Sequence, residues 1–276
     1  MAKKQNSIDV EKAVRFFFEL PDWKDRALKF AGVYLAAYVV LIIVYVLGFV
    51  ASIIPILGAL LFCGSFILVW LGMIAINFYF QGYKIEVTEA VAAGKKVEDI
   101  VILDKYQERV KEGAKLSIAS FIYMLPSVIL YFAAYAMMFI PLILTDGGGQ
   151  NEEPSGIFLV GMLLFYVLFF IGWILQMIVQ FAIFPAIWAT YSLEHNFKKS
   201  ISPEVLWSFI KDNYINIILF LAITMGMSMV MGFAAMLSLV LVLLCIGIVL
   251  YPLVFIVGGA LIMHAQAHMV GQMIKK

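Results

Sequence analysis

The stretch that decides the fold covers residues 213–274 and reads NYINIILFLAITMGMSMVMGFAAMLSLVLVLLCIGIVLYPLVFIVGGALIMHAQAHMVGQMI. It contains no Asp, Glu, Lys or Arg residue. A helix rises about 1.5 Å per residue, so this stretch would be roughly 90 Å long as a helix, about three times the ~30 Å hydrocarbon thickness of a bilayer. We therefore expect it to cross a membrane, turn and cross back, with spans at about residues 215–237 and 245–270.

The same length argument applies to the other uncharged runs, which are residues 30–83, 116–145 and 154–193. The first of these is long enough for two spans, and Pro55 marks the break between them. The predicted spans are residues 27–52, 56–83, 115–144 and 156–188. The composition agrees, because 64% of the residues are hydrophobic and only 13% are charged, against roughly 25% charged in a soluble domain. The sequence therefore predicts an all-α polytopic membrane protein with six transmembrane helices in a single integral membrane domain, residues 1–276.

Each pair of spans follows a polar or amphipathic segment. Residues 8–20 are predicted to form an amphipathic helix in the membrane interface, since Ala13 and Phe17 fall on one side and Lys12 and Arg15 mostly on the other. Residues 97–114 and 202–212 precede the second and third pairs. We expect three helical hairpins, each with such a lead-in segment.

The positive charges predict the orientation. All 19 Lys and Arg residues lie before the first span, in the second and fourth connections, or after the last span. Basic residues that flank spans stay on the cytoplasmic side, so both termini are predicted to be cytoplasmic. The formal net charge of +1 gives no reason to expect nucleic acid as a partner, whereas the lipid bilayer itself is an expected partner of the basic flanks.

Polar side chains within the spans are the candidate functional residues, because they are costly in lipid and usually face protein or water. Three pairs are spaced i, i+4 in the inner halves of spans two, four and six: Asn77 and Gln81, Gln176 and Gln180, and His264 and His268. One interpretation is a polar pocket open to the cytoplasm. The alternatives are hydrogen bonds between packed helices and, for the two histidines, a metal site.

Span five carries small residues among methionines. Gly226, Ser228 and Gly232 let a second helix approach closely, so they are a candidate helix-packing face within the bundle or against another subunit. The two cysteines, Cys63 and Cys245, are both near the outer ends of their spans. A disulfide between them is conceivable, but buried cysteine more often behaves as a small apolar residue.

Several short motifs together resemble the family of prokaryotic membrane proteins known as domain of unknown function 4013. They are Phe16 to Trp23 (FFFELPDW), Ile54 to Gly58 (IPILG), Gln81-Gly82-Tyr83, Gly113 to Pro126 (GAKLSIASFIYMLP), residues 191–220 and residues 244–272. The chain departs from the family pattern at Lys84, where an Arg is expected, and in residues 97–112, which lack Trp. The resemblance implies a multi-pass protein of the inner (plasma) membrane and implies no activity.

Two functions from different classes remain. The first is a non-catalytic scaffold or accessory subunit that binds a membrane protein partner or itself, favoured by the span-five face and by the charged connection of residues 84–115. The second is a small-solute transporter or channel, favoured by the three polar pairs. An enzyme is not expected, because no paired carboxylates and no nucleophile with a base appear in the sequence. No cofactor or metal is expected either.

Overall fold

Six long, apolar helices dominate the part of the chain that the structure describes. The structure is a computed structural model, and it describes residues 7–51, 55–144, 156–241 and 246–275. The helices long and apolar enough to cross a membrane lie at Trp23–Val50, Cys63–Ala92, Tyr106–Ile140, Phe158–Glu194, Tyr214–Val240 and Leu250–Ile274. The prediction of an all-α polytopic membrane protein is therefore confirmed.

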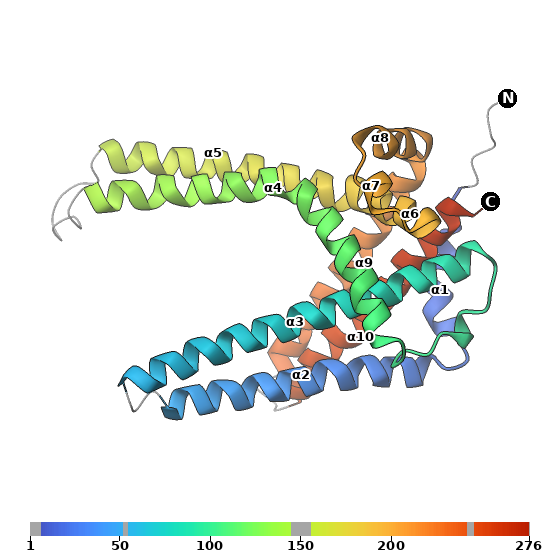
Figure 1. Cartoon of the computed structure of the whole chain (residues 1–276), viewed down its shortest axis with the longest axis horizontal. Coiled ribbons are helices and arrows are strands. Elements are labelled where there is room, and N and C mark those ends of the chain that lie inside the picture. The colour runs from blue at the N-terminus through green and yellow to red at the C-terminus, as the bar shows by residue number, and fades with distance from the viewer. Residues whose placement is uncertain (1–6, 52–54, 145–155, 242–245, 276) are drawn as a thin grey trace.

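Figure 1 labels the α-helices in chain order. The elements are α1 (Val10–Glu19), α2 (Trp23–Ala51), α3 (Pro55–Ala92), η1 (Val97–Asp99), α4 (Tyr106–Leu144), α5 (Gly156–Ile178), η2 (Val179–Ile183), α6 (Phe184–Glu194), α7 (Phe197–Ser200), α8 (Pro203–Asp212), α9 (Tyr214–Val240) and α10 (Gly247–Ile274).

Helix α3 is the centre of the arrangement. It packs against α2 on one side, α4 on another and α10 on a third, while α4 packs along α5 and α9 packs along α10. Figure 1 shows the α2/α3 pair and the α4/α5 pair diverging from each other toward the same side of the molecule. The buried side chains accordingly gather where α1, α3, α6 and α10 meet, and the arms of the two pairs are left to contact lipid.

Two glycines allow α3 and α4 to cross in backbone contact. A Cβ atom added to Gly113 would lie 1.7 Å from the carbonyl oxygen of Phe78, and one added to Gly82 would lie 2.1 Å from the carbonyl oxygen of Arg109. Ordinary carbon contacts are about 3.5–4.0 Å. Only glycine fits at these two positions, and this crossing fixes the start of α4 against α3.

The long helices extend beyond the predicted spans into charged sequence. Helix α3 continues past Tyr83 to Ala92, and α4 begins at Tyr106 and not near residue 115. Residues 97–114 therefore do not form one separate lead-in helix, because they divide into η1, a connecting segment and the first turns of α4. Helices α1 and α8 exist as separate elements, but their location in the membrane interface stays a prediction.

Two of the long helices are irregular near a proline. Helix α4, which contains Pro126, bends along its length in Figure 1. The chain forms a π-helical turn at Val179–Ile183, directly before Pro185 in α6. Proline has no N–H to donate and its ring crowds the preceding turn, and π-turns and bends are two ways in which a helix accommodates it.

The two ends of the described chain lie together. The backbone N–H of Asp9 donates a hydrogen bond to Gln272 Oε1 at 2.6 Å, and the backbone N–H of Ile8 donates to Asn216 Oδ1 at 3.2 Å. The start of α1 is therefore fixed to the inner ends of α9 and α10, the predicted cytoplasmic side.

Candidate functional site

A buried lysine lies where α3, α6 and α10 meet. The Lys84 side chain belongs to a residue that is only 5% exposed, and its Nζ donates a hydrogen bond to Gln266 Oε1 at 3.0 Å. The same Nζ lies 4.0 Å from the centre of the Trp188 ring and 5.0 Å from that of Phe184. Among the described residues, no carboxylate oxygen lies within 4.0 Å of this ammonium group.

The surroundings of Lys84 compensate its charge only in part. Removing an ammonium group from water costs several kcal/mol even after the protein relaxes, whereas a desolvated cation–π contact returns about 2 kcal/mol. One neutral amide and two aromatic faces leave two of the three ammonium protons without an acceptor that the structure shows. The site is therefore electrostatically suited to an anion.

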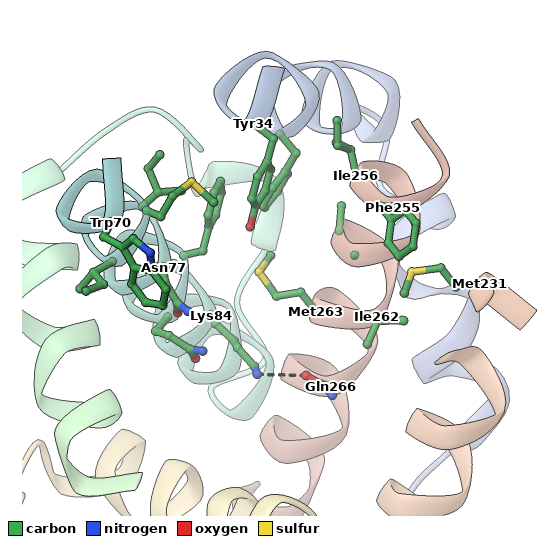
Figure 2. Close-up of a pocket in the computed structure, with 18 residues that line it drawn as sticks. Tyr34, Trp70, Asn77, Lys84, Met231, Phe255, Ile256, Ile262, Met263 and Gln266 are labelled. Carbon is green, nitrogen blue, oxygen red and sulfur yellow. Dashed lines mark hydrogen bonds between the residues drawn. The ribbon is translucent and has the colours of Figure 1, made fainter. Parts of the chain in front are cut away.

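Lys84 lines the inner end of a cavity of about 670 Å³ between α2, α3, α9 and α10. Figure 2 shows Lys84 reaching toward Gln266 across this cavity, with Asn77 on the same helix as Lys84. The remaining walls are mainly apolar and aromatic, and include Tyr34 and Trp70. The cavity thus has a polar end and a long apolar part.

The two amides predicted from span two belong to this cavity. Asn77 and Gln81 both line it, and Oε1 of Gln81 is buried without a hydrogen-bond partner among the described residues. Together with Lys84 they are spaced i, i+4 and i+7, which places all three on one face of α3. Because they share this face, all three side chains line the same cavity.

The two histidines of span six face another direction. His264 is fully buried, with Nδ1 2.8 Å from the carbonyl oxygen of Ala260 and Nε2 3.0 Å from the Tyr83 hydroxyl. Nδ1–H can only donate to that carbonyl, so Nε2 accepts the hydrogen bond from Tyr83. His268 packs against Phe16 with ring centres 4.4 Å apart. Both histidines therefore hold α10 against α1 and α3 and do not line the cavity.

The amides of span four are in a third place. Gln176 accepts a hydrogen bond from the Tyr131 hydroxyl at 2.8 Å and so joins α5 to α4. Gln180 lies in the π-helical turn and is exposed in this chain. The structure brings neither residue to the cavity between α2, α3, α9 and α10, so the three predicted pairs occupy three separate environments.

The small residues of span five have open space beside them. A Cβ atom added to Gly226 or Gly232 would meet nothing within 4 Å, and Ser228 is exposed. The close contact between α9 and α10 occurs elsewhere, where a Cβ at Gly258 would lie 2.7 Å from the sulfur of Met231. Packing of the Gly226, Ser228 and Gly232 face against a second subunit stays a prediction.

Two buried arginines hold the segment between α3 and α4. Arg26 donates hydrogen bonds to the Tyr83 hydroxyl at 2.8 Å and to the carbonyl oxygens of Val97 and Glu98 at 3.1 Å each, and it pairs with Asp22 at 2.8 Å.

Arg109 holds the second half of the same segment. It donates to the carbonyl oxygens of Val101 at 2.8 Å and Ile102 at 2.6 Å, and to Glu86 at 2.7 Å. The Tyr79 hydroxyl also donates to Ile102. Both guanidinium groups are nearly inaccessible to water. Residues 97–105 are therefore bound to the first turns of α2 and α4 by charge-assisted hydrogen bonds.

A further polar cluster joins α3, α4 and α6. Glu112 accepts hydrogen bonds from the Tyr191 hydroxyl and from Lys115 Nζ, the latter at 2.7 Å. His195 lies 3.0 Å from Glu89 and 3.4 Å from Glu112. Among the residues that the structure describes, no three His, Cys, Asp or Glu side chains are arranged to hold a metal ion. Cys63 is a free, exposed thiol, and the possible partner Cys245 lies outside the described residues.

Lys84 and Gln266 are site residues that the sequence did not predict. An uncharged run ends at Tyr83, which places Lys84 in the predicted membrane flank, but the i, i+4, i+7 spacing from Asn77 is a signal that this lysine shares a face with the two amides. Gln266 lies midway between His264 and His268 in sequence, which turns it about 200° from each on a helix. No sequence signal pointed to Trp188 as the aromatic partner of Lys84.

The comparisons with known proteins agree with the resemblance inferred from the motifs. Neither a curated protein nor a solved structure matches the chain. Residues 66–240 match the family described as "Protein of unknown function (DUF4013)", and this match covers more than half of the chain, including α4, α5 and α9 in full. The chain therefore belongs to the DUF4013 family of proteins of unknown function.

Proposed function

We propose that the protein is a non-catalytic scaffold or accessory subunit of a complex in the inner membrane, and that residues 97–105 are its docking segment for a protein partner. The observation that supports this proposal is a pair of arginine clamps, by which we mean the buried side chains of Arg26 and Arg109 that hold residues 97–105 by hydrogen bonds. Arg26 and Arg109 are buried in the bundle, and both donate to backbone carbonyls of this one segment.

The clamped segment presents apolar side chains outward. Ile102 is buried at 2% exposure, whereas Val101 is 53% and Leu103 is 40% exposed. The backbone around Val101 is held in place, so a partner would not have to order it on binding, which lowers the entropic cost of association. Charged residues flank this surface, among them Lys96, Asp99 and Lys105, and they would contribute specificity.

The alternative function, a small-solute transporter or channel, rests on the 670 Å³ cavity. Of the three cations that are buried among the described residues, Arg26 and Arg109 have carbonyl and carboxylate partners and do not line the cavity. Lys84 is the third, and it faces the cavity, where the described residues supply no carboxylate beside it for ion or proton coupling.

Gentle purification from native membrane tests the proposal, combined with reconstitution of the protein alone in liposomes. We expect recovery in a complex of fixed composition, and no selective solute flux from the liposomes. A Val101→Asp variant should lose the partner, because a carboxylate at the centre of an apolar contact must be desolvated.

Val205→Asp on α8 is the matched control, since Val205 is also exposed and lies on a different part of the molecule. It should retain the partner. Recovery of the wild-type protein as a lone protomer, together with selective flux, would replace the scaffold with the transporter.

A further inference from the structure

The cavity beside Lys84 has the dimensions and polarity of a site for one lipid molecule. Along α3 its lining runs from Trp70 to Lys84, a rise of roughly 21 Å, and along α10 from Phe255 to Gln266, roughly 16 Å. Half the hydrocarbon thickness of a bilayer is about 15 Å. The cavity therefore extends over about one leaflet.

The depth of the polar end matches that of lipid headgroups. The uncharged part of α3 runs from Pro55 to Tyr83, a rise of roughly 43 Å, which exceeds the ~30 Å hydrocarbon thickness. Lys84 follows directly and so lies at headgroup level on the predicted cytoplasmic side, while Trp70 lies some 21 Å deeper in the bilayer. A lipid of that leaflet has the same polarity, with its charge at the surface and its chains inside.

The polar end offers donors to an anion. Lys84 Nζ has Gln266 as its only hydrogen-bond partner among the described residues, and no carboxylate lies within 4.0 Å. The amide group of Gln81 lines the cavity one helical turn from Lys84, and that of Asn77 lines it about two turns away. A headgroup with a net negative charge would neutralise the Lys84 ammonium group better than a neutral or zwitterionic headgroup would.

The apolar part is open where a chain would lie. Gly259 lines the cavity, and a Cβ atom added there would meet nothing within 4 Å. Aromatic and methionine side chains, among them Tyr34, Trp70 and Met263, form the walls (Figure 2). Methionine and aromatic side chains adapt well to a flexible hydrocarbon chain.

From these observations we infer that the cavity between α2, α3, α9 and α10 binds an anionic lipid of the cytoplasmic leaflet, with the headgroup at Lys84 and Gln266 and an acyl chain along Gly259. This site is separate from the docking segment at residues 97–105. It requires no solute transport and no partner.

Native mass spectrometry of the purified protein, titrated with dioleoyl phosphatidylglycerol or dioleoyl phosphatidylcholine, tests the inference. The first bound lipid should be phosphatidylglycerol in clear preference to phosphatidylcholine. Lys84→Gln keeps a side chain able to bond Gln266 but removes the charge, and it should weaken phosphatidylglycerol binding roughly tenfold or more, the value of one charge-assisted hydrogen bond.

A second variant tests the chain-binding part independently of the charge. Gly259→Leu fills the open part of the cavity and should prevent lipid binding while leaving the fold intact. Two control variants should bind phosphatidylglycerol as the wild type does: Lys24→Gln, at an exposed lysine of α2, and Gly226→Leu, at an open position of α9 outside the cavity.

Two results would overturn the inference. Equal phosphatidylglycerol binding by the wild type, Lys84→Gln and Gly259→Leu would show that the lipid binds elsewhere on the surface. Displacement of the bound lipid by inorganic phosphate alone would show that the site recognises a free anion and not a lipid.

Discussion

Replacing Gly113 with alanine should separate α3 from α4 and destabilise the bundle. The added Cβ would lie 1.7 Å from the Phe78 carbonyl oxygen and 2.7 Å from the Gly82 nitrogen. Both are backbone atoms, so no rotamer change can relieve the contact, and the two helices must move apart by about 2 Å to restore ordinary van der Waals distances. Overpacking commonly costs 1–3 kcal/mol, and this backbone contact should cost about 3 kcal/mol.

Two other glycines provide a scale for the expected loss of stability. At Gly258 the added Cβ would meet the sulfur of Met231 at 2.7 Å, and because that side chain is flexible, Gly258→Ala should cost only about 1 kcal/mol. At Gly226 it would meet nothing, so Gly226→Ala should be neutral or slightly stabilising, since alanine favours helix over glycine by up to about 1 kcal/mol.

The assay is thermal unfolding of the three variants in the same detergent, followed by intrinsic fluorescence. On the scale of globular proteins of this size, a loss of about 3 kcal/mol lowers Tm by roughly 6–12 °C. We expect the largest decrease in Tm for Gly113→Ala, a smaller decrease for Gly258→Ala, and no decrease for Gly226→Ala. If Gly113→Ala and Gly226→Ala melt at the same temperature, the α3/α4 crossing described here is incorrect.

Three further predictions concern topology, the amides of span four and the arginine clamp. With Cys63 and Cys245 removed, a cysteine at Gly148 should react with an impermeant reagent added to intact cells and one at Lys96 should not; the reverse pattern contradicts cytoplasmic termini. Leucine at both Gln176 and Gln180 should lower Tm, because the Tyr131 hydroxyl loses its acceptor in the membrane; an unchanged Tm would mean that lipid tolerates the pair. Arg109→Ala should destabilise by about 3 kcal/mol and expose residues 97–105 to proteolysis, since it removes the buried donor to Glu86 and to the carbonyl oxygens of Val101 and Ile102; Arg15→Ala, at an exposed pair, should change neither.

The sequence predicted the membrane class and the six helices because both depend on composition along the chain. An uncharged run long enough to cross a bilayer has few alternatives to a transmembrane helix. The helix ends were less predictable, as in α3, because a helix continues into polar sequence for as long as its hydrogen bonds and packing are favourable.

The site was less accessible to sequence reasoning because its parts come from distant segments. The environment of Lys84 depends on Trp188 and Gln266, and neither has a charge or a spacing that identifies a lysine partner. Glycines illustrate the same limit. Gly113 in α4 lies just before a predicted span and Gly226 in α9 lies within one. Only the neighbouring helix makes the first indispensable and leaves the second in open space.

Site-specific photocrosslinking in intact cells tests the proposed docking segment most directly. A photoreactive amino acid replaces Val101, and another replaces Val205 as the control at an exposed position on α8. If residues 97–105 dock a protein partner, position 101 should yield one discrete crosslinked product that contains a second protein, and position 205 should not. Crosslinks to lipid alone at position 101, or the same products from both positions, would contradict the assignment of this protein as a scaffold or accessory subunit that acts through that segment.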